Sequence, residues 1–149
     1  MAEKAVEVAK ENIEAFNKGD WEKFTKSLAS DSVYEETATQ RKVKGGDQVK
    51  AVSEAWKKAF PDAKGTVTDA FASGNKATLE ITWEGTHKAD LESPAGKIPA
   101  TGKHITVPAV QVVTVEGDKI KETRHFFDLM TLLQQIGAVP TPAGAGSSR

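Results

Sequence analysis

The sequence contains no cysteine, which excludes a disulfide, a thiol nucleophile and a cysteine-ligated zinc ion. It also lacks an excess of either charge, because 20 Lys and Arg stand against 21 Asp and Glu, for a formal net charge of −1. Without a concentrated basic face, nucleic-acid binding is not expected. No apolar run approaches the roughly 20 residues that cross a bilayer, and residues 1–16 lack the continuous apolar core of a signal peptide. We therefore expect a cytoplasmic protein with no nucleic-acid or membrane partner.

Aromatic residues are scarce at 7%, whereas the hydrophobic fraction of 38% is ordinary for a globular protein. The length of 149 residues suits one domain with a real core and is too short for two ordinary ones. We assign residues 1–139 to this single domain. Residues 140–149 (PTPAGAGSSR) are rich in Pro, Gly, Ala and Ser, and this composition predicts a flexible tail.

The first 60 residues carry apolar side chains at helical spacing. This spacing predicts three helices, in residues 6–16, 21–28 and 49–60. Gly19 is a stop signal after the first helix, Asp20 can cap the second, and Pro61 ends the third. Residues 33–37, between the second and third helices, predict a short strand.

Beyond residue 61 the hydrophobic period changes to the two-residue alternation of strands. Four strands are predicted, over residues 66–72, 77–87, 104–116 and 119–127. The Gly-Asn and Gly-Asp pairs at 74–75 and 117–118 suit two-residue hairpin turns. Residues 88–102 contain several Pro and Gly residues and predict a long loop over the sheet edge. Asp128 can cap a short final helix that stops at Gly137.

Helices followed by a hairpin-linked antiparallel sheet indicate an α+β fold. The helices of the N-terminal half must cover one face of the sheet. If the sheet curls strongly, the space between the layers becomes a cone with a mouth. We therefore expect a cone-shaped, curved antiparallel sheet packed against three helices, with a short C-terminal helix.

Side-chain parity assigns the faces of the strands. In the second predicted sheet strand, Trp83 and His87 share the apolar face, so both are predicted to point inward. Both faces of the third strand are apolar, and we take the face of Gln111 as inward. The other face, with Val110 and Val112, then suggests either a central strand or an oligomer contact.

Parity in the last predicted strand separates the candidate acid/base residues. His125 and Phe127 share one side, whereas Asp128 falls on the other. His125 and Asp128 therefore cannot both point inward from one regular strand. In the short early strand, Tyr34 and Glu36 share a side.

Each candidate also has a structural explanation. Asp128 is fully explained as the N-cap of the final helix. His125 and His87 can be hydrogen-bonded structural histidines or members of an acid/base site. Glu36 is expected to be exposed to solvent unless it lies at the mouth of the cone. The histidines lack the i, i+4 spacing of a helical metal pair, so no metal site is predicted.

Five segments carry a family resemblance. They are NIEAFNKGDWEKFTKSLASDSVYEE, WKKAFPD, WEGTH, ATGK and RHFFDLMTLLQQIG. Together they resemble the SnoaL-like polyketide cyclases, also called ester cyclases, which have the nuclear-transport-factor-2-like fold. The resemblance covers nearly the whole chain up to Gly137. It implies an α+β cone with a deep pocket between the curved sheet and its helices, in agreement with the fold expected from periodicity.

The resemblance implies an intramolecular aldol closure of a polyketide ester, without a metal or cofactor. In the family, one aspartate near the end of the last strand serves as acid/base. Here the pocket-facing residue near that strand end is His125, a departure from the cyclase pattern, and Asp128 is the alternate acid/base. His87, Gln111 and Tyr34 are expected to orient substrate oxygens. The other expected substrate contacts are Trp83, Trp56, Phe16, Phe24, Phe127 and Glu36.

Two other functions remain open. One is a non-catalytic module that binds a small hydrophobic ligand in the same pocket. The other is an epoxide hydrolase, because the related limonene epoxide hydrolases share the cone; that chemistry needs two carboxylates and an arginine around a water. Glu36 points inward, but Arg124 faces outward and Arg41 is expected in a loop.

The expected partners are a small hydrophobic molecule and a second copy of the chain, bound through the outer sheet face. The residues expected at that contact are Val110, Val112 and Phe126.

Overall fold

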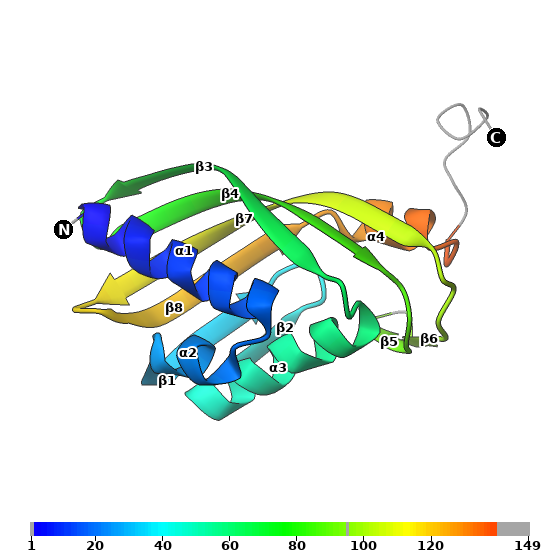
Figure 1. Cartoon of the computed structure of the whole chain (residues 1–149), viewed down its shortest axis with the longest axis horizontal. Coiled ribbons are helices and arrows are strands. Elements are labelled where there is room, and N and C mark those ends of the chain that lie inside the picture. Colours follow the sequence, from blue (N-terminus) through cyan, green and yellow to red (C-terminus); the bar gives the residue numbers. More distant parts are fainter. Residues whose placement is uncertain (1, 95, 140–149) are drawn as a thin grey trace.

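A computed structural model describes residues 2–94 and 96–139 (Figure 1). The predicted tail, residues 140–149, lies outside the described residues. The helices are α1 (Ala2–Lys18), α2 (Trp21–Lys26), α3 (Gly46–Ala59) and α4 (Leu129–Gln135). The strands are β1 (Leu28–Glu36), β2 (Arg41–Lys44), β3 (Lys64–Ser73), β4 (Lys76–Thr86), β5 (Leu91–Ser93), β6 (Gly96–Ile98), β7 (His104–Glu116) and β8 (Lys119–Phe127).

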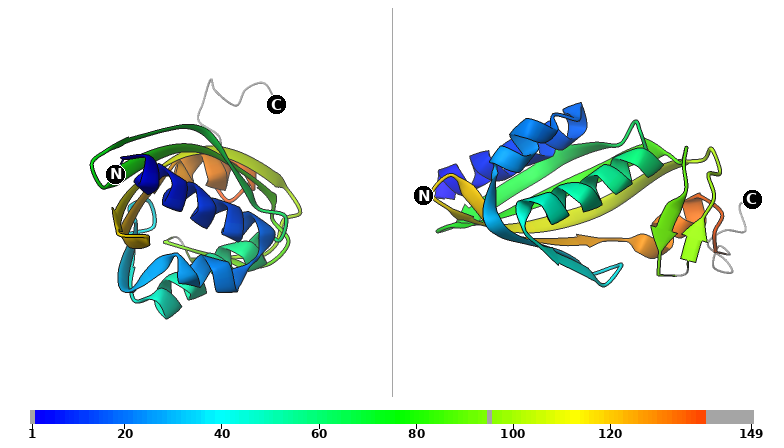
Figure 2. Two further views of the ribbon diagram at one scale, coloured as in Figure 1. Left: turned by 60° about the vertical axis from the view of Figure 1, so that its left-hand side comes forward. Right: turned by 90° about the horizontal axis from the view of Figure 1, so that it is seen from below.

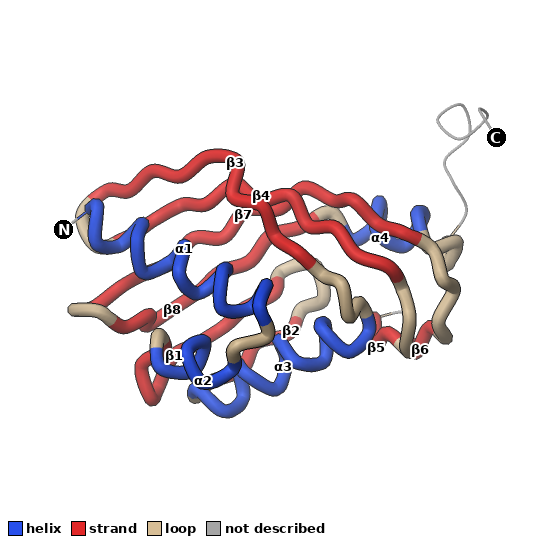
Figure 3. The backbone as a smooth tube through the Cα atoms, viewed as in Figure 1, coloured by secondary structure: helices blue, strands red, loops and turns tan. Residues whose placement is uncertain are grey.

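Six strands form one curved sheet in the order β2-β1-β8-β7-β4-β3. Neighbouring strands are antiparallel except β1 and β8, which run parallel. Helices α1, α2 and α3 lie over one face of this sheet, and α4 lies at the same end as the β5–β6 hairpin (Figures 1 and 2). Figure 3 shows the separation of helices from strands. The α+β fold predicted from the sequence is confirmed.

Local capping signals work as the sequence predicts. Asp20 caps α2 by accepting from the Lys23 N–H at 3.1 Å. Asp128 caps α4 in the same way. Gly19 and Gly137 follow their helices with φ angles of 69° and 80°, a left-handed conformation that favours glycine and stops a helix.

Two strand pairings were not predicted, one in the main sheet and one in a separate two-stranded sheet. Strand β2 pairs with β1 and places Arg41 opposite Glu36, so Arg41 lies in a strand and not in a loop. The expected loop 88–102 contains the short β5–β6 hairpin. Strands of three or four residues are too short to show a clear alternation, and charged residues dominate β2, so neither gave a periodic signal.

Strand parity is confirmed by burial. The inward residues of the central strands, Leu79, Val107 and Gln111 among them, are buried. On the outer face Val110 is only half-buried and Phe126 is 37% exposed. The concave face therefore forms the core, and aromatic side chains of α1 and α3 complete it from the helix layer.

Candidate active site

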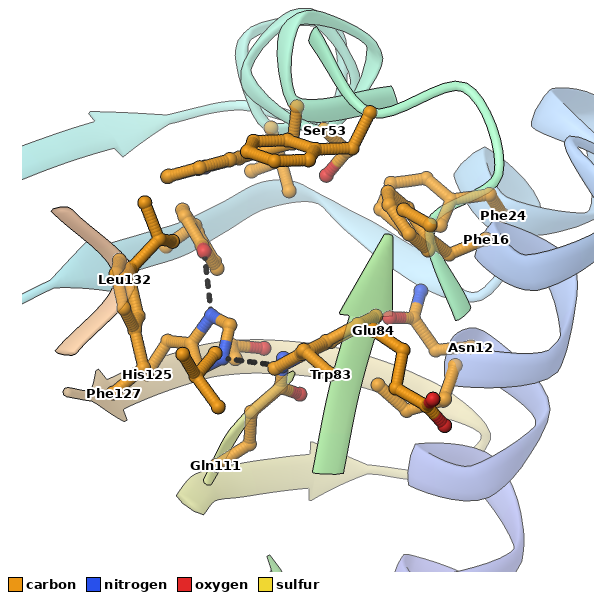
Figure 4. Close-up of a pocket in the computed structure, with 18 of the residues that line it drawn as sticks. Asn12, Phe16, Phe24, Ser53, Trp83, Glu84, Gln111, His125, Phe127 and Leu132 are labelled. Carbon is orange, nitrogen blue, oxygen red and sulfur yellow. Dashed lines mark hydrogen bonds between the residues drawn. The ribbon is translucent and has the colours of Figure 1, made fainter. Parts of the chain in front are cut away.

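A pocket lies between the concave face of the sheet and helices α1, α2 and α3 (Figure 4). The cavity volume is about 90 Å³, and about 830 Å³ of space lies between the walls when space open to solvent is included. The expected site residues that line it are Phe16, Phe24, Tyr34, Trp56, Trp83, Gln111, His125 and Phe127. The other polar residues of its lining are Asn12, Ser53, Glu84 and Thr123. The walls are otherwise apolar, as is typical of a site for a hydrophobic ligand.

His125 points from β8 into this pocket and is 7% exposed. Its Nε2 accepts a hydrogen bond from the indole N–H of Trp83 at 3.1 Å, and its Nδ1 lies 2.8 Å from the Tyr34 hydroxyl. Because an indole nitrogen can only donate, the single proton of the neutral imidazole lies on Nδ1. Burial lowers the pKa of His125 to about 4, although the charge of Glu36 opposes this shift. At neutral pH the ring is therefore uncharged, in one fixed tautomer.

Glu36 is fully buried behind Tyr34 and is surrounded by donors. Its Oε2 accepts from the Tyr34 hydroxyl at 2.7 Å and from the indole N–H of Trp56 at 2.6 Å. Its Oε1 accepts from the Thr39 hydroxyl at 2.7 Å and lies 3.9 Å from Arg41 Nε. This arrangement suits an ionised carboxylate, which only accepts. The expected solvent exposure of Glu36 is wrong, because its inward parity carries it into the core, where these donors compensate for lost water.

Tyr34 links the histidine to the buried carboxylate. Its hydroxyl accepts from His125 Nδ1–H and donates to Glu36. Burial and the neighbouring Glu36 charge raise the pKa of Tyr34 well above 10, so the hydroxyl keeps its proton. The hydrogen bonds therefore run in one direction, from Trp83 through His125 and Tyr34 to Glu36. A positive charge that develops on the imidazole is stabilised by Glu36 at the end of this chain.

Two polar side chains beside His125 are available to a ligand. Gln111 lies directly opposite His125 in the β7–β8 register, and Thr123 precedes His125 on the same face. Both line the pocket and are 7% exposed. Among the described residues, neither side chain makes a hydrogen bond. The Gln111 amide can therefore donate to a ligand oxygen next to the His125 ring.

Asp128 lies outside the pocket. It is exposed, and it accepts from the backbone N–H and the hydroxyl of Thr131 at 3.0 and 2.7 Å. These hydrogen bonds lower the pKa of Asp128. The alternation that turns His125 inward turns Asp128 away, so the structure does not bring this alternate acid/base to the pocket.

His87 is also absent from the pocket lining. It points inward as predicted and is fully buried, but it follows the last residue of β4. There its ring stacks on Phe60, with centroids 5.4 Å apart, and its Nδ1 accepts from the Thr101 N–H at 3.2 Å. The expected contact between His87 and a substrate oxygen has no support, because the neighbouring segment covers the ring.

Sequence reasoning missed Thr39 and Arg41, which hold Glu36 from the β1–β2 turn and from β2. A signal was present, because Glu36 and Arg41 have opposite charges and flank a four-residue turn. Recognition of a hairpin there would have paired them.

The described ranges contain no group of His, Asp and Glu arranged to hold a metal ion. No helix within them is long and apolar enough to span a membrane.

A curved sheet whose helices enclose a mainly apolar pocket places the protein among the cone-shaped folds of the nuclear-transport-factor-2 type. The sequence profile of the SnoaL-like polyketide cyclases matches residues 6–136, so the chain belongs to this family.

Solved structures of known proteins have the same fold. A protein of Jannaschia sp. CCS1, assigned as a SnoaL-like polyketide cyclase, superposes with a TM-score of 0.82 at 18% identity over 94% of this chain and 96% of that one. A Catenulispora acidiphila protein of ketosteroid isomerase-like fold gives 0.76 at 19% identity over 91% and 98%. An epoxide hydrolase of Mycobacterium tuberculosis, similar to the limonene epoxide hydrolases, gives 0.71 at 16% over 91% and 90%. No curated protein matches the chain by sequence.

Proposed function

We propose that the protein catalyses cofactor-free proton transfer at a carbon next to a carbonyl group, in a small hydrophobic compound. The reaction is an intramolecular aldol-type closure or a related isomerisation or lyase reaction. The observation that carries the proposal is the neutral, tautomer-fixed imidazole of His125 on the wall of an apolar pocket, backed by Tyr34 and the buried Glu36.

His125 acts as the base and then as the acid. Nε2 takes the proton, the C–H electron pair moves toward the carbonyl oxygen, and the Gln111 amide donates to the resulting enolate oxygen. Glu36 stabilises the imidazolium through Tyr34. In a closure, the enolate carbon then bonds to a second carbonyl carbon. Nε2–H returns its proton to the oxygen of that carbonyl, so the product is an isomer of the substrate.

The low basicity of His125 fits this chemistry. A pKa of about 4 keeps the ring free of a proton at neutral pH. A carboxylate base of pKa about 4.6 removes a proton next to a carbonyl in ketosteroid isomerase, so a base of this strength is sufficient when the C–H bond is activated. The aromatic walls position the compound and exclude water, which strengthens the charge interactions at the ring.

The second candidate is a non-catalytic module that binds a small hydrophobic molecule. One observation favours it: both ring nitrogens of His125 already have hydrogen-bond partners. An epoxide hydrolase has less support. Such an enzyme needs two carboxylates around a water, whereas Glu36 lies behind Tyr34 and the only carboxylate in the described lining is the exposed Glu84.

Exchange of deuterium from D₂O into the α-carbon of 2-indanone, followed by ¹H NMR, tests the proposal. We expect the wild type to accelerate exchange and His125→Asn to abolish the acceleration. The asparagine amide can still donate to Tyr34, so the fold is retained. His104→Gln, at an exposed histidine outside the pocket lining, is the matched control and should exchange like the wild type. Equal rates for His125→Asn and the wild type, or no acceleration by the wild type, would contradict the proposal and favour the binding module.

A further inference from the structure

The lone pair that His125 needs as a base already accepts a hydrogen bond in the structure. Nε2 carries a single in-plane lone pair, and the indole N–H of Trp83 donates to it at 3.1 Å. A proton cannot move from a substrate carbon to Nε2 while that hydrogen bond persists. Trp83 itself lines the pocket, as His125 does, so a ligand reaches both the histidine and its donor.

The surroundings of Trp83 explain why its indole N–H faces His125 in the structure. Gly65 lies opposite Trp83 in the β3–β4 register, and a Cβ atom on Gly65 would come within 2.7 Å of the indole ring. Phe16 meets the ring edge-on at 5.3 Å between centroids. Asn17 fixes the Gly65 backbone, accepting from its N–H at 2.8 Å and donating to its carbonyl at 2.9 Å. The indole therefore lies against a strand without a side chain at that point, with its N–H directed at His125.

Release of Nε2 leaves the indole N–H without an acceptor in a mainly apolar pocket. Loss of a hydrogen bond in such surroundings weakens binding by about 10-fold or more unless another acceptor replaces it. A carbonyl oxygen is such an acceptor, because it has two lone pairs and no proton. A hydrocarbon of the same shape is not.

We propose that Trp83 is a transferable hydrogen-bond donor that selects carbonyl compounds: the bound carbonyl oxygen takes the indole N–H and thereby frees Nε2 of His125. The proposal rests on the proposed function and adds a substrate-selecting residue to it. Trp83 and Gln111 then both donate to the oxygen that becomes the enolate. Without a carbonyl ligand, Nε2 of His125 keeps its hydrogen bond to the Trp83 indole and cannot take a proton.

The test compares 2-indanone with indane, a hydrocarbon of nearly the same shape. Binding is followed through the indole ¹H–¹⁵N signals of the three tryptophans. We expect 2-indanone to shift the Trp83 indole signal and indane to leave it in place. The affinity ratio of 2-indanone to indane should fall about 10-fold in Trp83→Phe. It should stay constant in Trp21→Phe, the matched control, because Trp21 packs on Phe16 and Phe24 outside the pocket lining.

The outcomes separate this inference from the proposed function. An unchanged affinity ratio in Trp83→Phe overturns the inference, as does an unmoved Trp83 signal in wild type or a failure of 2-indanone to bind. The wild-type signal decides the question if Trp83→Phe does not fold. Selective ketone binding without deuterium exchange supports the inference and contradicts the enzyme. Exchange that does not depend on Trp83 contradicts the inference alone.

Discussion

Acid should destabilise this protein through His125 in a defined pH window. The pKa of histidine in the unfolded chain is about 6.5, whereas burial lowers the pKa of His125 to about 4 in the folded protein. Between these values the unfolded chain binds a proton that the folded protein does not. The free energy of unfolding therefore falls as the pH falls through the window and is unaffected by His125 above it. A difference of about 2.5 pH units corresponds to about 3 kcal/mol.

Urea unfolding of the wild type and of His125→Asn between pH 7 and pH 4 measures this contribution. Asparagine does not titrate, so the stability difference between the two proteins should change by about 3 kcal/mol over the window. Carboxyls with a lowered pKa, such as Asp31 and Asp62, titrate in both proteins and cancel in the difference. Profiles of wild type and His125→Asn that stay parallel to within about 0.5 kcal/mol would refute the buried, neutral state of His125.

Four further variants test other parts of the site and surface. Tyr34→Phe leaves Nδ1–H of His125 without an acceptor, and the ring cannot change tautomer because Nε2 faces a donor. Urea unfolding should show that the free energy of unfolding falls by about 2–4 kcal/mol. A fall of less than about 1 kcal/mol would mean that water replaces the hydroxyl. Trp83→Phe removes the donor that stabilises neutral His125, so an NMR titration should show the pKa of His125 rising above about 4; an unchanged midpoint speaks against this hydrogen bond. Asp128→Ala should cost about 1 kcal/mol as a lost N-cap and leave 2-indanone exchange intact, whereas lost exchange would restore Asp128 as the acid/base. We also propose a homodimer through the outer sheet face, which Phe126→Lys should convert to monomer in sedimentation; a monomeric wild type contradicts it.

Local signals in the sequence were sufficient for most of the fold. The change from helical to two-residue periodicity marked the helices and the long strands, because each buries one face against the other layer. Parity within single strands predicts Trp83 and His125 on the concave face, and both line the pocket. Both faces of β7 are apolar, so parity alone could not decide that Gln111 faces inward. The N-cap at Asp128 followed from residue type and from the apolar run after it.

The hydrogen-bonded chain at the site could not be predicted in the same way, because each link joins distant segments. Trp83 on β4 reaches His125 on β8 because the β4–β7 and β7–β8 registers bring the two residues together across the sheet. The buried carboxylate of Glu36 accepts a hydrogen bond from Trp56, which reaches it from α3. His87 leaves the pocket because the chain after β4 folds back, with the Gly102 N–H donating to its carbonyl at 2.8 Å. Single-strand patterns do not encode such contacts.

The state of the His125 ring is the claim on which the site and its chemistry depend. A long-range ¹H–¹⁵N correlation spectrum of the ligand-free protein at pH 7 measures it directly. We predict a protonated Nδ1 and an unprotonated Nε2, with the ring taking up a second proton only near pH 4. A proton on Nε2 at pH 7, or a doubly protonated ring near neutral pH, would contradict the account.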